Sequence, residues 1–164
     1  MDIGSGNGYP SASLSNFAPH PFEIDGVQCN SMEGFLQSLK FASIDMQKHV
    51  CTLVGKAAKF KGKKRKWYND QVLYWNGKMY GRKSDEYQNL LNRAYNALYQ
   101  NSGFKKALEA TNGAVLTHSI GKNDKTKTVL TSQEFCSRLT HLRDKGELPV
   151  VKEIKNLDNE NYEN

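Results

Sequence analysis

Three polar side chains stand at spacings that would bring them onto one face of a helix. Glu33, Gln37 and Lys40 follow one another at intervals of four and three residues, which matches the helical repeat. A carboxylate, an amide and an ammonium in one row can form the wall of a polar site, where the carboxylate acts as a base. The alternative is a plain helix start, in which Glu33 closes a capping box with Asn30 and the other two side chains face water.

Two more segments contain residue types suited to sugar, base or phosphate. The amide of Asn16 can hold ribose hydroxyls, and the ring of Phe17 can stack on a base; an Asx-turn beside a core phenylalanine is the alternative. Arg82 follows the glycines Gly77 and Gly81, and its guanidinium suits bidentate recognition of phosphate. A surface hairpin without a ligand explains the same pattern.

His118 and Ser119 directly follow an apolar run, 114–117, that predicts a short buried strand. The end of such a strand is a common place for a site residue, although a structural histidine is the simpler interpretation. A Ser/His hydrolase is disfavoured because the chain has no GxSxG sequence. It also lacks the GxxxxGK[ST] loop of ATPases and a GxGxxG turn between a strand and a helix.

The cysteines do not predict a metal centre. Cys29, Cys51 and Cys136 are odd in number and far apart, with no CxxC pair and no Cys/His cluster at zinc spacing. We expect them to be reduced thiols inside the protein, and we expect neither a metal nor a cofactor.

The net charge of +6 is concentrated in one segment. Residues 56–66 hold seven lysine and arginine side chains and no acidic one, and Trp67 follows directly. Such a cluster beside an aromatic residue is typical of contacts with phosphate groups or nucleic acid; a solvated helix end is the alternative. The candidate contacts are Lys56, Lys59 and Lys63.

Length and composition indicate one ordinary globular domain. The 164 residues, 38% hydrophobic and 24% charged, suit a single core, which we assign to residues 1–150, followed by an acidic, flexible tail over 151–164. No apolar run approaches the roughly 20 residues of a membrane-spanning helix, and residues 1–6 lack the features of a signal peptide. We expect a cytoplasmic protein with no membrane partner, acting in the host cytoplasm if it is virally encoded.

Periodicity and capping residues predict a mostly helical chain. An Asp-Gly pair inside the alternating segment 22–29 indicates a β-hairpin. Segment 71–75 fits a strand or a helix, and 1–13 fits a loop or a short edge strand. The fold class expected is α+β, a predominantly helical single domain with a few short strands. Helices are predicted over 31–43, 45–53, 55–60, 85–98, 101–110 and from Thr131 or Ser132 to Leu142.

The motifs of the first half resemble one family, the NADAR (YbiA-like) proteins. Members carry a Leu-Ser-Asn-Phe start, a Phe-x-x-x-Gly strand and a helix with the pattern Glu-x-x-x-Gln-x-x-Lys-Phe. The matching segments here, in the same order and with the same spacing, are Leu14-Ser-Asn-Phe17, Phe22-Glu-Ile-Asp-Gly26 and Glu33-Gly-Phe-Leu-Gln37-Ser-Leu-Lys40-Phe41. The resemblance covers residues 9–145 and implies the YbiA-like fold.

The second half of the chain matches this family less closely. Residues 87–107 are similar to a Lys-Phe-x-Gln-Asn segment with its helix, and 128–143 stand where the family has Asn-x-Leu-Gly and a closing helix that ends in Arg. The segment 118–121, His-Ser-Ile-Gly, occupies the place of Trp-Gly-x-Gly. A histidine thus replaces the family's tryptophan, and the acidic residue that often follows is not at the matching place, so substrate recognition can differ here.

The resemblance implies an N-glycosidase, a hydrolase acting on N-glycosyl compounds. Activities associated with the family are removal of ADP-ribose from guanine in nucleic acid, as in antitoxins, and hydrolysis of phosphorylated riboflavin-pathway ribosylamines. The basic segment 56–66 favours the first, with an ADP-ribosyl or phosphoribosyl substrate and DNA or RNA that carries the modification. A non-catalytic sensor of ADP-ribose or nucleotide, and a structural nucleic-acid-binding domain, are the alternatives.

The candidate residues fit this chemistry without a metal. Breaking the bond between C1′ of ribose and nitrogen builds positive charge on the sugar ring, which a carboxylate such as Glu33 stabilises. Lys40 can act as an acid or as an imine-forming amine, and the two roles need different protonation states. The residues predicted to bind substrate, with Phe17 or Trp75 stacking on a base, are Asn16, Phe17, Gln37, Trp75, Arg82, His118 and Ser119.

Overall fold

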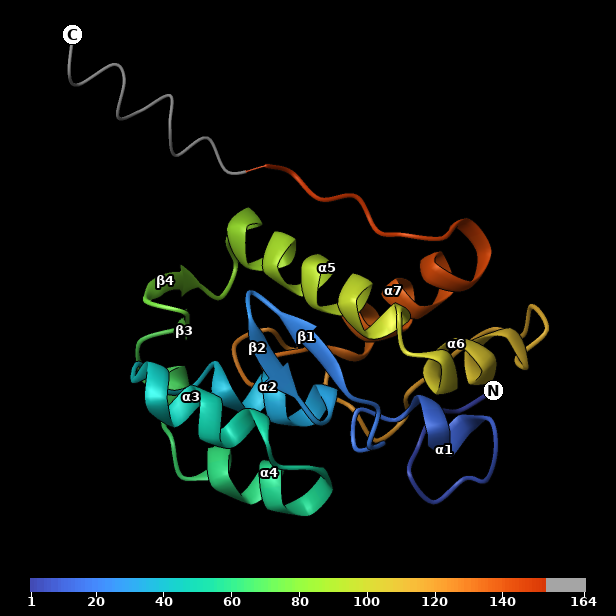
Figure 1. Ribbon diagram of the computed structural model, residues 1–164, viewed down its shortest axis with the longest axis horizontal. Helices are drawn as coiled ribbons and strands as arrows, with labels where there is room; N and C mark the ends of the chain where they lie inside the picture. Colours follow the sequence, from blue (N-terminus) through green and yellow to red (C-terminus); the bar gives the residue numbers. More distant parts are fainter. Residues whose placement is uncertain (153–164) are drawn as a thin grey trace, which may run out of the picture.

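The computed structural model describes residues 1–152, which form a helix-rich α+β arrangement (Figure 1). Its strands are β1 (Phe22–Ile24), β2 (Val27–Cys29), β3 (Val72–Trp75) and β4 (Lys78–Gly81). Its helices are α1 (Ser11–Leu14), α2 (Met32–Ser38), α3 (Ile44–Cys51), α4 (Gly55–Lys63), the 3-10 turn η1 (Trp67–Asn69), α5 (Asp85–Tyr99), α6 (Ser102–Glu109) and α7 (Ser132–Lys145). The predicted fold class is confirmed.

Two antiparallel hairpins contain the named strands. β1 pairs with β2 so that Ile24 lies opposite Val27, and the turn residues Asp25 and Gly26 have φ of 50° and 77°, as a two-residue hairpin turn requires. The Asn-Gly pair at 76–77 joins β3 to β4 in the same way, with φ of 51° and 87°. The first predicted hairpin is confirmed, and the segment that fitted strand or helix is strand β3.

Helix α2 has a different N-cap from the predicted one. The side-chain oxygen of Ser31 accepts a hydrogen bond from the Gly34 N–H at 3.0 Å, whereas the Asn30 side chain donates to the Thr52 carbonyl at 2.9 Å. The predicted capping box is therefore wrong. Glu33 is the second helical residue, and its carboxylate does not cap the helix.

Helix α2 also ends early, at Ser38 rather than at residue 43. The carbonyl of Leu39 accepts a hydrogen bond from the Tyr74 N–H of β3 at 2.8 Å, so it does not serve the residue four positions further on, as a continuing helix would need. Lys40 consequently lies in the turn after the helix, next to Leu39, the residue that is hydrogen-bonded to β3.

The other predicted helices form close to their expected bounds. α3 and α4 begin and end within a few residues of prediction. Ser84 caps α5, Asn101 caps α6, and α7 has a full capping box between Thr131 and Glu134. One face of α5 is buried, and its residues are Tyr87, Leu90, Leu91, Ala94, Tyr95 and Leu98.

Two segments, 11–14 and 114–117, differ from prediction. Residues 11–14 form α1 inside a stretch expected to be loop or edge strand. The strand predicted over 114–117 is wrong, because that segment pairs only through an isolated parallel bridge between Asp2 and Thr117, and Val115 is 79% exposed. This bridge is the β-pairing that the structure shows for the two segments, 1–13 and 114–117, that were expected to contain strands.

Helix α2 lies at the centre of the molecule (Figure 1). It packs against α3, α4 and β2, while α5 packs against β1, β4, α6 and α7. Phe35 of α2 meets Trp75 of β3 edge-on, with ring centroids 4.9 Å apart, so the hairpins and helices share one core. Within residues 1–152, no helix is long and apolar enough to cross a membrane. The predicted tail, 151–164, lies outside the described residues beyond its first two.

Candidate active site

Glu33 lies on a buried side of α2, and its carboxylate is bonded within the same helix. Only 9% of its surface is exposed, and the Gln37 amide donates a hydrogen bond to its Oε1 at 2.8 Å. Burial raises the pKa of the Glu33 carboxyl, and the Gln37 hydrogen bond opposes that shift. Nearby positive charges that also oppose it come from Lys40, Lys59 and His118.

Lys40 keeps its place beside Glu33 although the helix ends between them. Its backbone N–H donates to the Gln37 carbonyl at 3.2 Å, and its side chain is half-buried. Burial lowers the pKa of the Lys40 ammonium, and the charge of Glu33 opposes this. Burial thus pushes an acid and a base toward their neutral forms, which is a common feature of functional sites.

Asn16 reaches the same region from the loop that follows α1. Its carbonyl accepts a hydrogen bond from the Glu33 N–H at 2.9 Å, and its side-chain oxygen accepts one from the Tyr95 hydroxyl at 2.8 Å. Burial raises the pKa of Tyr95 well above its usual value, so the hydroxyl stays a donor and directs the NH₂ group of Asn16 away from itself. That NH₂ group is suited to a sugar oxygen.

His118 is fixed at the edge of this cluster by two contacts. Its Nδ1 lies 2.8 Å from the Ile3 carbonyl, and its ring meets Phe135 edge-on at a centroid distance of 5.2 Å. Because a carbonyl only accepts hydrogen bonds, Nδ1 carries a proton, and Nε2 is the nitrogen left for a ligand. His118 also influences the charge state of Glu33.

Arg82 does not face this cluster, and its prediction as a phosphate contact is corrected. It is 1% exposed, its guanidinium donates to both carboxylate oxygens of Glu134 at 2.6 and 3.2 Å, and its Nε donates to the Thr128 carbonyl at 2.8 Å. Because each guanidinium nitrogen makes one of these bonds and the side chain is buried, Arg82 is a structural residue that links the end of β4 to α7.

Trp75 has a structural role. It is 2% exposed, and its indole N–H donates to Asp25 at 2.8 Å, so its ring is unavailable for stacking on a base and the prediction of substrate contact is corrected. Ser119 is exposed, and its hydroxyl and backbone N–H both donate to the Asp2 carboxylate, at 2.6 and 2.8 Å. Its contact with substrate stays a prediction.

The remaining predicted residues surround helix α4. Phe17 is half-buried and lies against the first residue of α4. Lys56, Lys59 and Lys63 are exposed along the helix, and the charge of Lys59 acts on the α2 carboxylate. Their contact with phosphate or nucleic acid stays a prediction.

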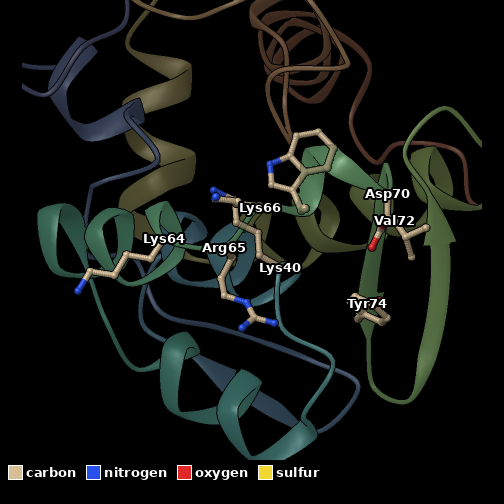
Figure 2. A pocket seen from close by; sticks show the side chains of 8 residues that line it. Lys40, Lys64, Arg65, Lys66, Asp70, Val72 and Tyr74 are labelled. Carbon is tan, nitrogen blue, oxygen red and sulfur yellow. The ribbon is translucent and has the colours of Figure 1, made fainter.

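A basic pocket adjoins the cluster (Figure 2). Part of its lining comes from the basic segment 56–66 and Trp67, and the sequence did not indicate that Asp70, Val72 and Tyr74 lie opposite them. Tyr95 lies in the helix predicted over 85–98, and its hydroxyl was the one signal of a polar contact. The lining residues are Lys40, Lys64, Arg65, Lys66, Trp67, Asp70, Val72 and Tyr74.

Comparisons with known proteins relate the chain to phage proteins by sequence. Residues 8–144 match the family described as "Bacteriophage protein GP30.3". A phage T4 protein, described as "Uncharacterized 17.1 kDa protein in Gp30-rIII intergenic region", is 40% identical over 147 residues, covering 88% of this chain and 97% of that protein.

A solved structure relates the chain to YbiA by fold. The NMR structure of the E. coli protein YbiA is similar with a TM-score of 0.59 and 18% identity, covering 100% of this chain and 88% of that one. The YbiA-like fold expected from the sequence is thereby confirmed.

Proposed function

The chain belongs to the bacteriophage protein GP30.3 family and shares the fold of YbiA, and from this premise we propose that it is an N-glycosidase that hydrolyses a ribose–nitrogen bond. The observation that carries the proposal is the buried Glu33 carboxylate, bonded to Gln37 and surrounded by positive charge. None of the ion pairs within residues 1–152 neutralises it. The order of the motifs around it, which is that of the NADAR family, supports the same activity.

The reaction needs a carboxylate and an acid at close quarters. The bond between C1′ and the base nitrogen breaks, its electron pair leaves on the nitrogen, and water adds to C1′. Glu33 stabilises the positively charged ring or accepts the proton of the attacking water, while Lys40 in its ammonium form donates toward the departing base. Asn16 and the Nε2 atom of His118 are suited to holding the sugar.

We infer that the substrate is ADP-ribose attached to guanine bases in nucleic acid. The exposed lysines of α4 are accompanied by two exposed aromatic rings, Phe60 at 55% and Tyr68 at 49%, a combination that suits phosphates and bases. A member of a phage family with this activity would act in the cytoplasm of the infected cell, as a counter-defence or antitoxin enzyme.

A free phosphorylated ribosylamine is the second candidate substrate. The small volume of the basic pocket, about 150 Å³, favours it, because such a pocket can enclose one phosphate group without a polymer. The dependence of substrate affinity on salt distinguishes the two candidates. If the protein contacts six or more phosphates of a polymer, its affinity should fall by about 10³-fold or more between 50 and 200 mM salt. The affinity for a free metabolite should fall far less.

The decisive variant is Glu33→Gln, assayed on ADP-ribosylated DNA, NAD and phosphoribosylamines. Loss of the carboxylate should reduce turnover by about 10³-fold or more while the substrate still binds, because the amide keeps the shape of the side chain. Glu23→Gln, on the exposed face of β1, is the matched control and should keep full activity. Binding without turnover by the wild type across all these substrates would replace the enzyme with a sensor.

A further inference from the structure

The basic pocket beside the end of α2 is enclosed by two chain segments and one central lysine. In Figure 2, Asp70, Val72 and Tyr74 lie on one side of the pocket, and Lys64 and Arg65 lie on the other. Lys40 belongs to both this pocket and the cluster around Glu33. The two sites are therefore adjacent and share a cation.

The walls of this pocket are held in place by backbone and ring contacts. The Arg65 N–H donates to the Gly62 carbonyl at 3.0 Å, and the Arg65 guanidinium lies 5.1 Å from the centre of the Phe41 ring. On the opposite wall, the hydrogen bond from Tyr74 to Leu39 fixes β3 against the residue that precedes Lys40. A site with fixed walls can bind a ligand without ordering its own backbone.

Charge and size together indicate the chemistry of the ligand. Four basic residues and one acidic residue, Asp70, line the pocket, and of the basic ones Lys64 directs its ammonium away from the others (Figure 2). Its volume of about 150 Å³ equals that of about five water molecules in the liquid. This is enough for a phosphate with part of the attached sugar.

We propose that this pocket is a phosphate subsite, which binds the phosphate monoester or diphosphate group of a ribosyl substrate next to the Glu33 cluster. The ribosyl part of this statement rests on the proposed function, whereas the binding of phosphate does not. A bound phosphate would stabilise the ammonium form of Lys40 by direct charge attraction. Occupation of the subsite would thereby favour Lys40 as an acid over Lys40 as an imine-forming amine.

The test compares two double variants with the same change of charge. Calorimetric titration with pyrophosphate and with ribose 5-phosphate should show at least about tenfold weaker binding in Arg65→Gln/Lys66→Gln than in the wild type, since charge-assisted contacts are lost. The control, Lys48→Gln/Lys106→Gln at exposed positions of α3 and α6, should change affinity by less than about twofold at the same ionic strength. Lys66→Gln alone serves if the first variant is unstable.

Several outcomes would overturn the subsite. They are the absence of binding of both phosphate probes to the wild type, equal weakening in the two double variants, and binding of ribose as strong as that of ribose 5-phosphate. Glu33→Gln should keep the affinity for both probes, so a failed glycosidase assay and a failed subsite are separate results.

Discussion

Two buried glutamates, Glu33 in α2 and Glu134 in α7, have opposite surroundings. Burial alone would raise the pKa of Glu134, but hydrogen bonds from Arg82, the Thr131 N–H and the Gln88 amide lower it to about 2. Glu33 has the single hydrogen bond from Gln37, and burial dominates, so its pKa is raised.

The difference between the two separates a structural charge from a candidate reactive one. The guanidinium of Arg82 spans the Glu134 carboxylate in a fixed fork and stays charged at any physiological pH. The cations near Glu33 include Lys40, an ammonium whose pKa burial lowers, and a lysine of this kind can exchange a proton. A carboxylate whose oxygens accept several hydrogen bonds, such as Glu134, stabilises the fold. A carboxylate with fewer hydrogen bonds, such as Glu33, can still accept one from a substrate.

Breaking the ion pair between Arg82 and Glu134 should cause the largest loss of stability. Arg82→Met leaves Glu134 buried without its counter-charge, which typically costs about 3–5 kcal/mol. Urea unfolding followed by circular dichroism measures this loss. The double variant Arg82→Met/Glu134→Gln should recover part of it, because neither member of the pair is then left without the other. If Arg82→Met were as stable as the wild type, the Glu134 carboxylate would not have the structural role that distinguishes it from Glu33.

Acid should affect the two glutamates in opposite directions. Because the folded-state pKa of Glu134 is about 2 and its ordinary value is 4.5, its ionised form stabilises the fold above pH 4.5, by about 3 kcal/mol. That contribution is lost as pH falls from 4.5 toward 2. Glu33 has a raised pKa, so its charge opposes folding above that pKa, and protonation on acidification removes the penalty.

Unfolding free energies measured at several pH values, each relative to the matching Gln variant, test this contrast. The stability of the wild type relative to Glu134→Gln should decrease with acid below pH 4.5, and its stability relative to Glu33→Gln should increase as the pH falls through the raised Glu33 value. Parallel trends for the two carboxyls would remove the distinction between them.

Local features of the fold could be predicted from the sequence, whereas long-range partners could not. The Asp-Gly turn at 25–26 and the helix over 85–98 depend on neighbouring residues, and both predictions are confirmed. The predictions of substrate contact for Arg82 and Trp75 are wrong because the hydrogen-bond partners of these buried side chains, Glu134 and Asp25, lie about 50 residues away along the chain. No periodicity reveals such a partner.

Helical spacing predicts the row of Glu33, Gln37 and Lys40, but a contact with a distant strand determines where its last member lies. The Leu39 carbonyl accepts a hydrogen bond from Tyr74 of β3, and the helix ends before Lys40. Helical spacing therefore predicts these residues as neighbours, but Lys40 lies in the turn after the helix. Residues 64–66 belong to the basic segment predicted to contact phosphate, but their position beside Lys40 could not be predicted, because nothing local shows that the loop after α4 turns toward the end of α2.

A glycine of α4 offers the most selective way to disturb Glu33 without touching it. A Cβ at Gly62 would lie 1.8 Å from Oε1 of Gln37, so Gly62→Ala should rotate that flexible amide and weaken its hydrogen bond to Glu33. We expect kcat/KM to fall by about tenfold, the equivalent of one hydrogen bond, while stability changes by no more than about 1 kcal/mol, since alanine favours a helix. The double variant Gly62→Ala/Gln37→Ala should be no less active than Gln37→Ala alone, because the atoms that would lie within 3 Å belong to the missing amide and only the Cβ of residue 37 remains, at 3.1 Å. Unchanged activity in Gly62→Ala would mean that the Gln37 bond does not hold Glu33 in its working position.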